Sequence, residues 1–493
     1  MKVLLLSMPD AAPLIIHDTA VHMPNLGIAC VGGNIDPQHD VRIIDLIRKR
    51  RQLKKYLCRV LQKFRPDLVG LSAMSWQYDT CTRIIRLIRE VLPDVKIAIG
   101  GYHATLMPEE IAASDEGRQI DFIIRGEGEE AFRRLVSALD GTDRLEDVPS
   151  LSFRREGKIV HNKRGKPLDL ARLRLPIRDR RRLTRGYHVM YNKIEVMETS
   201  RGCTRSCSYC SIRHMYGKNF RTYPMERVLG DLDDIYHKRK SRWVFIADDN
   251  LVLNPKRLIR LCDAIIKKKY KGLCIVAQAD SISISRNEEM VKKMAKAGFV
   301  SLFLGIENVS AKNLETANKG NIVAASRKAV KLCHKYGIMV IGGLVLGFPD
   351  DDENALIENF AFFNSLKVDA TYCQILTPYP KTAIREMLIR KGLVENVSDY
   401  RWYNGLWANV RTRHLNAKEL QYYFWYHKEN VLGWWNPSAF IRRNGKGWTG
   451  IWSYVFKPLM KYMLDRKQRK IGREGRFQED MEALRNMNRF PDL

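Results

Sequence analysis

Short apolar runs alternate with amphipathic stretches along the first 140 residues. Five runs have the length of strands, at 3–6, 41–44, 68–71, 96–99 and 122–124, and helical periodicity follows at 53–63, 80–91 and 129–139. Regular alternation of this kind is typical of parallel α/β folds. The pattern predicts a doubly wound, Rossmann-like sheet with its ligand site at the carboxyl ends of the strands.

A second alternating series occupies the middle of the chain. Its six apolar runs lie at 193–196, 243–247, 273–277, 300–304, 339–343 and 371–375, and helical stretches at 225–238, 255–268, 287–297 and 324–336 separate them. Six strand and helix units in succession predict a curved parallel sheet, a partial (β/α)6 barrel of the TIM type. Its chemistry should also lie at the carboxyl ends of the strands.

These patterns divide the chain into four parts. We predict a ligand-binding domain at 1–150, a basic linker at 151–190, a barrel domain at 191–395 and a separate, mostly helical unit at 396–493. The linker contains Pro167, Pro176 and the run Arg180-Arg181-Arg182, and seven of the nine tryptophans lie beyond residue 400.

Composition adds the cellular setting. The 493 residues are 45% hydrophobic and 28% charged, as in globular proteins. The longest apolar run, 338–348, is far shorter than the roughly 20 residues that cross a bilayer. Ten cysteines scattered through apolar segments indicate a reducing compartment, so we expect a cytoplasmic protein. The net charge of +29 leaves open an anionic membrane surface, nucleic acid, an acidic substrate or simply a solvated basic surface.

Three cysteines follow the first strand of the second series. Cys203, Cys207 and Cys210 lie within eight residues, and thiolates select zinc or iron-sulfur clusters. A closed zinc or cluster site usually takes four protein ligands, yet no fourth cysteine is near and His214 lies at an unfamiliar spacing. Three ligands on a cubane cluster leave one iron open to a substrate. Chance cysteines or a zinc knuckle are the alternatives.

The C-x-x-x-C-x-x-C spacing, with Tyr209 before the last cysteine, resembles the motif of the radical S-adenosylmethionine (SAM) superfamily. The resemblance implies that Cys203, Cys207 and Cys210 bind three irons of a four-iron four-sulfur cluster while SAM chelates the fourth. Electron transfer then releases a 5′-deoxyadenosyl radical, and the electron donor would be a flavodoxin or ferredoxin.

Later strand ends resemble the same superfamily. The resemblance places Asp249 near the amino group of SAM, Glu307 near its ribose or methionyl part and Gly347 against its adenine, with Gln278 at the end of the third strand. The stretch 377–382 resembles a loop of the cobalamin-associated branch. Each feature alone is also typical of a helix cap or a turn.

The first domain carries loops that resemble those of cobalamin-binding domains. The residues concerned are Ser72, Gly100, Gly101, His103, Gly126, Glu127 and Gly128, together with the stretch 24–28. Glycine lets backbone approach a flat ligand closely. The D-x-H-x-x-G motif that supplies a histidine to cobalt is absent, so cobalt should lack that ligand, and we place His103 near the corrin periphery. A Rossmann-like domain that binds nothing is the alternative.

Together these features are similar to class B radical SAM methyltransferases and to anaerobic magnesium-protoporphyrin ester cyclases. The resemblance implies cobalamin-dependent methylation of an unactivated carbon, with oxidative cyclisation or rearrangement as the runner-up. A third reading is an RNA methylthiotransferase with a second cluster on Cys30, Cys58 and Cys81, although Cys58 lies in a helical stretch. A non-catalytic scaffold is the fourth.

The C-terminal region bears on the substrate. Aromatic segments such as 422–426 and 434–435 are followed by nine cations, namely Arg442, Arg443, Lys446, Lys457, Lys461, Arg466, Lys467, Arg469 and Lys470. This mixture is typical of interfacial membrane segments. It favours a small-molecule substrate of lipid or other large apolar type, with peripheral contact at the inner membrane face and nucleic acid not expected. A packed helical cap is the alternative.

Overall fold

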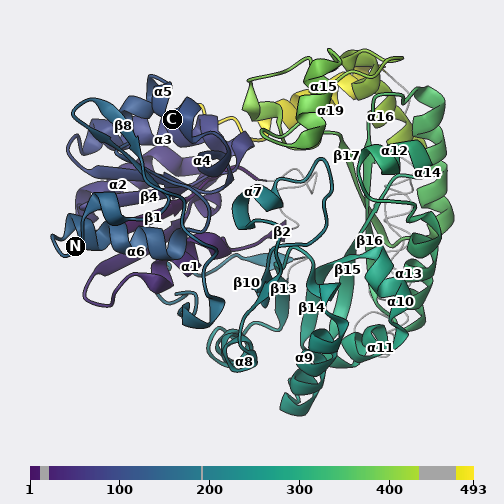
Figure 1. Cartoon of the computed structure of the whole chain (residues 1–493), viewed down its shortest axis with the longest axis horizontal. Helices are drawn as coiled ribbons and strands as arrows, with labels where there is room; N and C mark the ends of the chain where they lie inside the picture. Colours follow the sequence, from purple (N-terminus) through teal and green to yellow (C-terminus); the bar gives the residue numbers. More distant parts are fainter. Residues whose placement is uncertain (12–20, 190–191, 432–473) are drawn as a thin grey trace.

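The computed structural model describes residues 1–11, 21–189, 192–431 and 474–493, and it contains two α/β sheets that lie next to each other (Figure 1). The first sheet has the order β3-β1-β4-β5-β6-β7-β8, in which the strands from β3 to β6 are parallel and β7 runs antiparallel to both of its neighbours, β6 and β8. Its strands are β1 (Lys2–Ser7), β3 (Asp40–Asp45), β4 (Leu68–Ser72), β5 (Lys96–Gly100), β6 (Phe122–Ile124), β7 (Leu151–Arg155) and β8 (Lys158–His161).

Helices cover both faces of this sheet, as predicted for a doubly wound fold. They are α1 (Leu26–Asn34), α2 (Leu53–Phe64), α3 (Tyr78–Val91), α4 (Tyr102–Leu106), α5 (Pro108–Ala113) and α6 (Gly128–Leu139). The apolar faces of α2 and α3 fill one core, and those of α1 and α6 fill the other. Both faces of β1 are therefore buried, which explains its continuous apolar run.

The first sheet extends beyond residue 150, where we had predicted the linker to begin. Phe153 in β7 pairs with Phe122 in β6, and both side chains are buried. The edge of β6 thus gains an antiparallel partner that adds to the core. The end of the predicted linker is not exposed to solvent either. Arg178 is buried and pairs with Asp231, and Arg181 is buried and pairs with Glu195.

The second sheet has the order β17-β16-β15-β14-β13-β10-β9-β2. The six strands from β10 to β17 are parallel, and their positions match the six predicted runs. Its strands are β10 (Asn192–Met197), β13 (Trp243–Ile246), β14 (Cys274–Asp280), β15 (Phe299–Glu307), β16 (Met339–Leu346) and β17 (Ala370–Ile375), with β9 (His188–Val189) and β2 (Val21–His22) at the edge. Because β2 comes from the first domain, the chain ties the two sheets together at this edge.

Helices cover the outer face of the curved sheet (Figure 1). They include α8 (Met225–Asp233), α9 (Pro255–Lys268), α10 (Ser281–Arg286), α11 (Glu288–Ala297), α12 (Ala311–Thr316), α13 (Val323–Lys335), α14 (Glu353–Leu366) and α15 (Ala383–Arg390), while α7 (Ile212–Tyr216) follows the cysteine loop. Their buried faces share one core with the strands.

In the part of the chain that the structure describes, the C-terminal helices do not form the separate unit that we predicted. The described ones are α16 (Ala417–Val431) and α19 (Glu474–Asn486). Leu420 and Phe424 belong to the core of the second domain, whereas Phe490 is buried in the core of the first. Apolar side chains of α16, and Phe490 beyond the end of α19, therefore pack against the neighbouring domains. Residues 434–435 and the nine cations from Arg442 to Lys470 lie outside the described residues.

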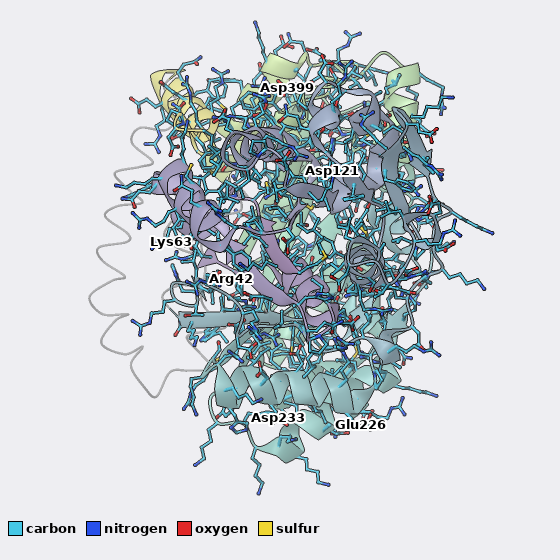
Figure 2. The ribbon with its side chains drawn as sticks, turned by 90° about the vertical axis from the view of Figure 1, so that its left-hand side faces the viewer. Arg42, Lys63, Asp121, Glu226, Asp233 and Asp399 are labelled. Atoms are coloured by element: carbon cyan, nitrogen blue, oxygen red, sulfur yellow. The ribbon has the colours of Figure 1, made fainter. Side chains whose placement is uncertain are left out.

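Charged side chains of both signs lie on the surface of the described residues. Figure 2 labels acidic and basic side chains on one side of the molecule, with Arg42 and Lys63 on the first domain and Glu226 and Asp233 on α8. Arg42 lies 3.8 Å above the ring of Phe64, and Asp233 pairs with Lys268 at 2.7 Å. In the part of the chain that the structure describes, no helix combines the length and hydropathy needed to span a bilayer.

Candidate active site between the two sheets

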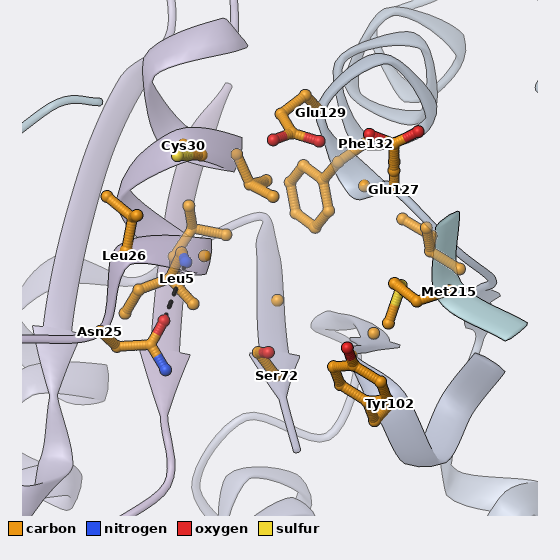
Figure 3. Close-up of a pocket in the computed structure, with 18 of the residues that line it drawn as sticks. Leu5, Asn25, Leu26, Cys30, Ser72, Tyr102, Glu127, Glu129, Phe132 and Met215 are labelled. Carbon is orange, nitrogen blue, oxygen red and sulfur yellow. Dashed lines mark hydrogen bonds between the residues drawn. The ribbon is translucent and has the colours of Figure 1, made fainter. Parts of the chain in front are cut away.

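A cavity of about 440 Å³ lies where the carboxyl ends of the first sheet face the second domain (Figure 3). Leu5, Gly70, Ala98 and Phe132 form its inner, apolar part. Of the residues predicted from sequence, Ser72, Gly100, Gly101, Gly126, Glu127 and Gly128 all line it. The second domain contributes Val196, Glu198, Arg201, Met215, Tyr216, Phe245 and Ala247. The cavity is therefore shared by both domains.

Glycines form much of the cavity mouth for two different reasons. Gly101 has φ +93°, and a Cβ there would come within 2.7 Å of the Ala73 carbonyl oxygen, so only glycine fits. At Gly100 a Cβ would meet only the Ile124 carbonyl, at 3.9 Å. A larger side chain at Gly100 would consequently enter open space at the cavity wall.

His103 does not line this cavity, contrary to the sequence-based prediction. It lies in α4, is 2% exposed, and its ring centroid is 4.2 Å from that of Tyr78 and 5.2 Å from that of Tyr400. Burial lowers the pKa of His103 to about 3, which keeps the ring neutral. Tyr102, the first residue of α4, lines the cavity, whereas His103 packs between Tyr78 of α3 and Tyr400.

The three N-terminal cysteines cannot hold a common cluster. Cys58 and Cys81 pack into the core beneath α2 and α3, whereas Cys30 lies in α1 on the opposite face of the sheet. The sheet separates Cys30 from the other two cysteines. The chain therefore lacks the second cluster site that the RNA methylthiotransferase hypothesis requires of these three residues.

The loop of Cys203, Cys207 and Cys210 follows β11 (Ser200–Arg201). It begins at Gly202, whose φ of +85° and close approach to the Asn219 carbonyl exclude a side chain. The Cys210 amide donates to the Cys207 carbonyl at 3.2 Å, and Ser208 is anchored on α12 through the Ala317 carbonyl at 3.0 Å. The loop is thus held at both ends.

The cysteines are free and partly buried. Burial raises the pKa of the Cys207 thiol and raises that of Cys210 to about 12, so both are protonated unless a metal binds them. Among the described residues, no three His, Cys, Asp or Glu side chains gather around one point as ligands of a single ion do. The cysteines of a cubane cluster each bind a different iron, and their sulfurs need not meet at one point.

Two adjacent aspartates after β13 have different roles. Asp248 is 1% exposed and accepts hydrogen bonds from the Thr199 amide and hydroxyl at 2.6 Å each, so it is a structural anchor. Asp249 accepts from the Gly202 amide at 2.8 Å. Burial raises the pKa of Asp249 to about 6. Asp249 therefore connects this strand end directly to the cysteine loop.

Glu307 ends β15 in a left-handed conformation with φ +68°. Its carboxylate lies 2.9 Å from Lys319 Nζ, and Tyr209 is hydrogen-bonded to it. Burial disfavours the Lys319 ammonium, but Glu307 and Cys207 nearby raise its pKa overall. A non-glycine residue in this region costs of order 1–3 kcal/mol and is typical of functional sites. Sequence reasoning missed Lys319, which lies in a loop without a recognisable motif.

Gln278 and Gly347 lie on the same edge of the second sheet. Gln278 is on β14 beside Phe303 of β15. Gly347 follows β16 with φ +86°, donates its amide to Asp351 at 2.9 Å, and is approached by Leu420 of α16. None of the residues assigned to SAM lines the shared cavity. The cavity reaches the second domain at residues just before and just after the cysteine loop, such as Arg201 and Met215.

Two further residues at the boundary between the domains were not predicted. Tyr102 lines the cavity and is close enough to Cys210 and Asp249 for their charges to raise its pKa further than burial alone does. Arg201 bonds to Glu127 and Glu129 of the first domain and to Glu198 of its own. The contacts of Arg201 with Glu127 and Glu129 join residues more than 70 positions apart, so no local pattern could have revealed them.

Comparison with known proteins identifies both domains. Residues 13–136 match the B12 binding domain, and residues 197–363 match the radical SAM superfamily. The chain is therefore a radical SAM enzyme with an N-terminal cobalamin-binding domain.

The particular family follows from the relatives. The chain is 30% identical over 423 residues to a protein of Pyrococcus horikoshii described as an uncharacterized methyltransferase, which covers 85% of this chain and 90% of that protein. The chain belongs to this family of cobalamin-dependent radical SAM methyltransferases, and its cofactors are a four-iron four-sulfur cluster, SAM and cobalamin.

More distant relatives include both predicted reaction types. The anaerobic magnesium-protoporphyrin IX monomethyl ester cyclase of Rubrivivax gelatinosus is 24% identical, over 82% of this chain and 77% of that protein. The hopanoid C-3 methylase of Methylococcus capsulatus is 25% identical, over 75% of this chain and 70% of that one.

The methyltransferase TsrM of Kitasatospora setae, solved with cobalamin and a four-iron four-sulfur cluster, shares the fold. Its TM-score is 0.65 at 17% identity, over 79% of this chain and 75% of that one.

Proposed function

We propose that this enzyme methylates an unactivated carbon of a lipid or another large apolar metabolite, with cobalamin in the shared cavity and SAM at the cysteine loop. The observation that carries the proposal is the cavity itself. It is lined by the strand ends of a cobalamin-binding domain on one side and by residues next to the cysteine motif on the other.

The cavity suits a corrin in its chemistry. Backbone at Gly100, Gly101 and Gly126 offers close approach to a flat macrocycle, and the inner wall of Leu5 and Phe132 is apolar. In the described part of the chain no histidine lines the cavity, so the residues present would leave cobalt without a histidine ligand from this wall.

The second domain supplies the residues for the other cofactor. Cys203, Cys207 and Cys210 would hold the cluster, and Asp249, Gln278, Glu307 and Gly347 lie along the neighbouring strand ends where SAM would bind. When bound, these groups supply a carbon-centred radical and a transferable methyl group. Lys319 would balance the charge of Glu307 beside them.

The chain's own contribution is to position and to exclude water. Tyr102 and Met215 lie on the cavity wall between the corrin site and the cysteine loop. Asp249 fixes the Gly202 amide, and α12 fixes Ser208, which limits motion of the thiols. Holding reactive groups in a fixed, dry arrangement is the main way in which a protein assists such cofactors.

The methylase relatives support an apolar substrate. The hopanoid C-3 methylase spans most of this chain, and the C-terminal sequence is rich in aromatic and basic residues. We also propose peripheral contact with an anionic membrane face, through residues 432–473, which lie outside the described part. In the described part of the chain, Phe424 and Trp425 of α16 are buried and therefore not available to a membrane.

Anaerobic reconstitution with iron, sulfide and hydroxocobalamin tests the proposal. The loaded protein should contain about four irons per chain, bind one corrin and release 5′-deoxyadenosine from SAM under reducing conditions. With extracted polyisoprenoid lipids as substrates, the product should gain the mass of one methylene.

The cyclase relative makes the second candidate, an oxidative cyclisation, testable in the same assay. A product that loses hydrogen without gaining carbon would favour it. Failure to bind corrin while the cluster is intact would contradict the proposed function.

A further inference from the structure

A buried ionic network joins the two domains at the wall of the shared cavity. Arg201 lies at its centre and is 6% exposed. Its guanidinium Nη1 donates to Glu127 Oε1 at 3.0 Å and its Nη2 to Glu129 Oε1 at 2.5 Å. Its Nε lies 3.1 Å from both carboxylate oxygens of Glu198.

The network extends beyond this arginine. Arg221 Nη2 lies 3.0 Å from Glu127 Oε2, and the Tyr223 hydroxyl donates to Glu198 at 2.8 Å. The Cys30 thiol of α1 lies 3.7 Å from the same carboxylate. Three carboxylates thus face two guanidinium groups at the cavity wall, and Arg227 adds to Arg201 in lowering the pKa of Glu198.

One end of the network lies at the cavity, and the other end lies next to the cysteine loop. Glu127, Glu129, Glu198 and Arg201 line the cavity, and Figure 3 shows Glu129 of α6 and Glu127, which precedes this helix, on either side of Phe132. In the other direction, Arg201 is separated from Cys203 by one residue, and that residue, Gly202, is fixed by Asp249. Consecutive Cα atoms are 3.8 Å apart, so a movement of Arg201 is transmitted directly to the first cysteine.

We infer that Arg201 is a positioning residue that couples occupancy of the cavity to the geometry of the cysteine loop. A corrin carries carboxamides at its periphery, and their N–H groups are donors that the carboxylates of Glu127 and Glu129 can accept. When these carboxylates turn toward a bound ligand, their hold on Arg201 changes, and the start of the cysteine loop changes with it. Buried, well-ordered charge networks transmit such changes because they are costly to break.

The inference rests on the proposed function and can be tested separately from it. Coupling between two binding sites is reciprocal. The cluster must therefore change the affinity for corrin by the same factor by which corrin changes the affinity for the cluster. We expect hydroxocobalamin to bind cluster-loaded protein roughly five- to tenfold more tightly than chelator-stripped protein. Corrin binding should also shift the electron paramagnetic resonance of the reduced cluster.

The test variant is Glu129→Gln, which keeps size and an acceptor oxygen but removes the charge facing Arg201. The matched control is Glu130→Gln, in the same helical turn, which makes no recorded contact with Arg201. In Glu129→Gln the affinity ratio should fall toward one and the spectral shift should disappear, with iron content unchanged, while Glu130→Gln should keep both.

A merely structural lock gives a different result. It would lower the melting temperature of Glu129→Gln but preserve the ratio and the shift, and that outcome would overturn the inference. If Glu129→Gln does not fold, Glu127→Gln serves in its place. Glu127 also contacts Arg201, and its second partner, Arg221, remains in that variant. A wild-type ratio of one would overturn the inference too, whereas absence of any corrin binding by loaded wild type would instead refute the proposed function.

Discussion

The two sheets of this enzyme prepare their sites by different means. The first presents backbone and apolar surface, since glycines and the Leu5 to Phe132 wall line its strand ends. The second presents side chains that bind or carry charge, among them three thiols, Asp249 and the Glu307–Lys319 pair. A large preformed macrocycle needs space and shape, whereas a small charged ligand and a metal cluster need specific donors. The two sites should therefore fail in different ways when changed.

The largest effect is expected from replacing Cys203, Cys207 and Cys210 together by alanine. Iron should fall from about four per chain to below one, and 5′-deoxyadenosine release should be lost, while corrin binding persists in weakened form. Metal analysis and chromatography measure the two. Cys58→Ala is the control and should keep full iron, because Cys58 packs against the core of the first domain. A variant triple that retained its cluster would contradict the assignment.

Gly100→Leu is expected to weaken corrin binding and to leave the iron content unchanged, which is the reverse of the cysteine variant. Its side chain would project into open space at the cavity wall, so hydroxocobalamin affinity should fall by about 3 kcal/mol, roughly 10²-fold, with iron unchanged. Equilibrium titration followed by absorbance measures this. Gly230→Leu, on α8 with no atom near its Cβ position, should bind corrin normally. Unaltered affinity in Gly100→Leu would place the corrin elsewhere.

Phe490→Ala tests how the C-terminal segment closes the first domain. Phe490 is 3% exposed in that core, so its truncation should destabilise the fold by about 3 kcal/mol and lower the melting temperature. Thermal unfolding followed by circular dichroism is the measurement. The exposed neighbour Arg489→Ala should melt as wild type does. Equal melting of both variants would show that the segment does not stabilise this domain.

A smaller, pH-dependent effect is expected at Asp10, just beyond β1. Burial raises the pKa of Asp10 to about 7, against an unfolded value of 3.8. Its folded pKa is the higher one, so the protonated form stabilises the fold in acid and this stability is lost as pH rises from about 4 through 7.

Asp10→Asn keeps the acceptor for the Thr80 hydroxyl, which lies 2.8 Å from Asp10 Oδ1, and removes the titration. Between pH 5.5 and 8, wild type should lose about 2 kcal/mol relative to the variant. Melting temperatures at both pH values measure it, with the exposed Asp94→Asn in the same domain as control. Parallel behaviour of wild type and Asp10→Asn would mean that Asp10 is not the titrating group.

The sequence predicted those features that depend on local pattern. The strands of both parallel series and the two kinds of domain were predicted correctly because period, spacing and turn residues are visible in short windows, while the roles assigned to the cysteines and to the glycine loops stay predictions. The linker predicted to start at 151 and the separate unit predicted at 396–493 differ from the structure because β7 pairs with β6 and Phe490 packs into the core formed with α2 and α3. The packing of His103 against Tyr400 was not visible in the sequence either, because the two residues are distant in the chain. The contacts of Arg201 and Lys319 belong to the same group.

The central claim is that corrin and cluster face each other across the cavity between the domains. Spin relaxation of bound cob(II)alamin, measured by pulsed electron paramagnetic resonance with the cluster oxidised and then reduced, tests it most directly. Reduction of the cluster should accelerate relaxation of the cobalt signal in wild type and leave it unchanged in the triple cysteine variant. Identical relaxation in both proteins would contradict the account.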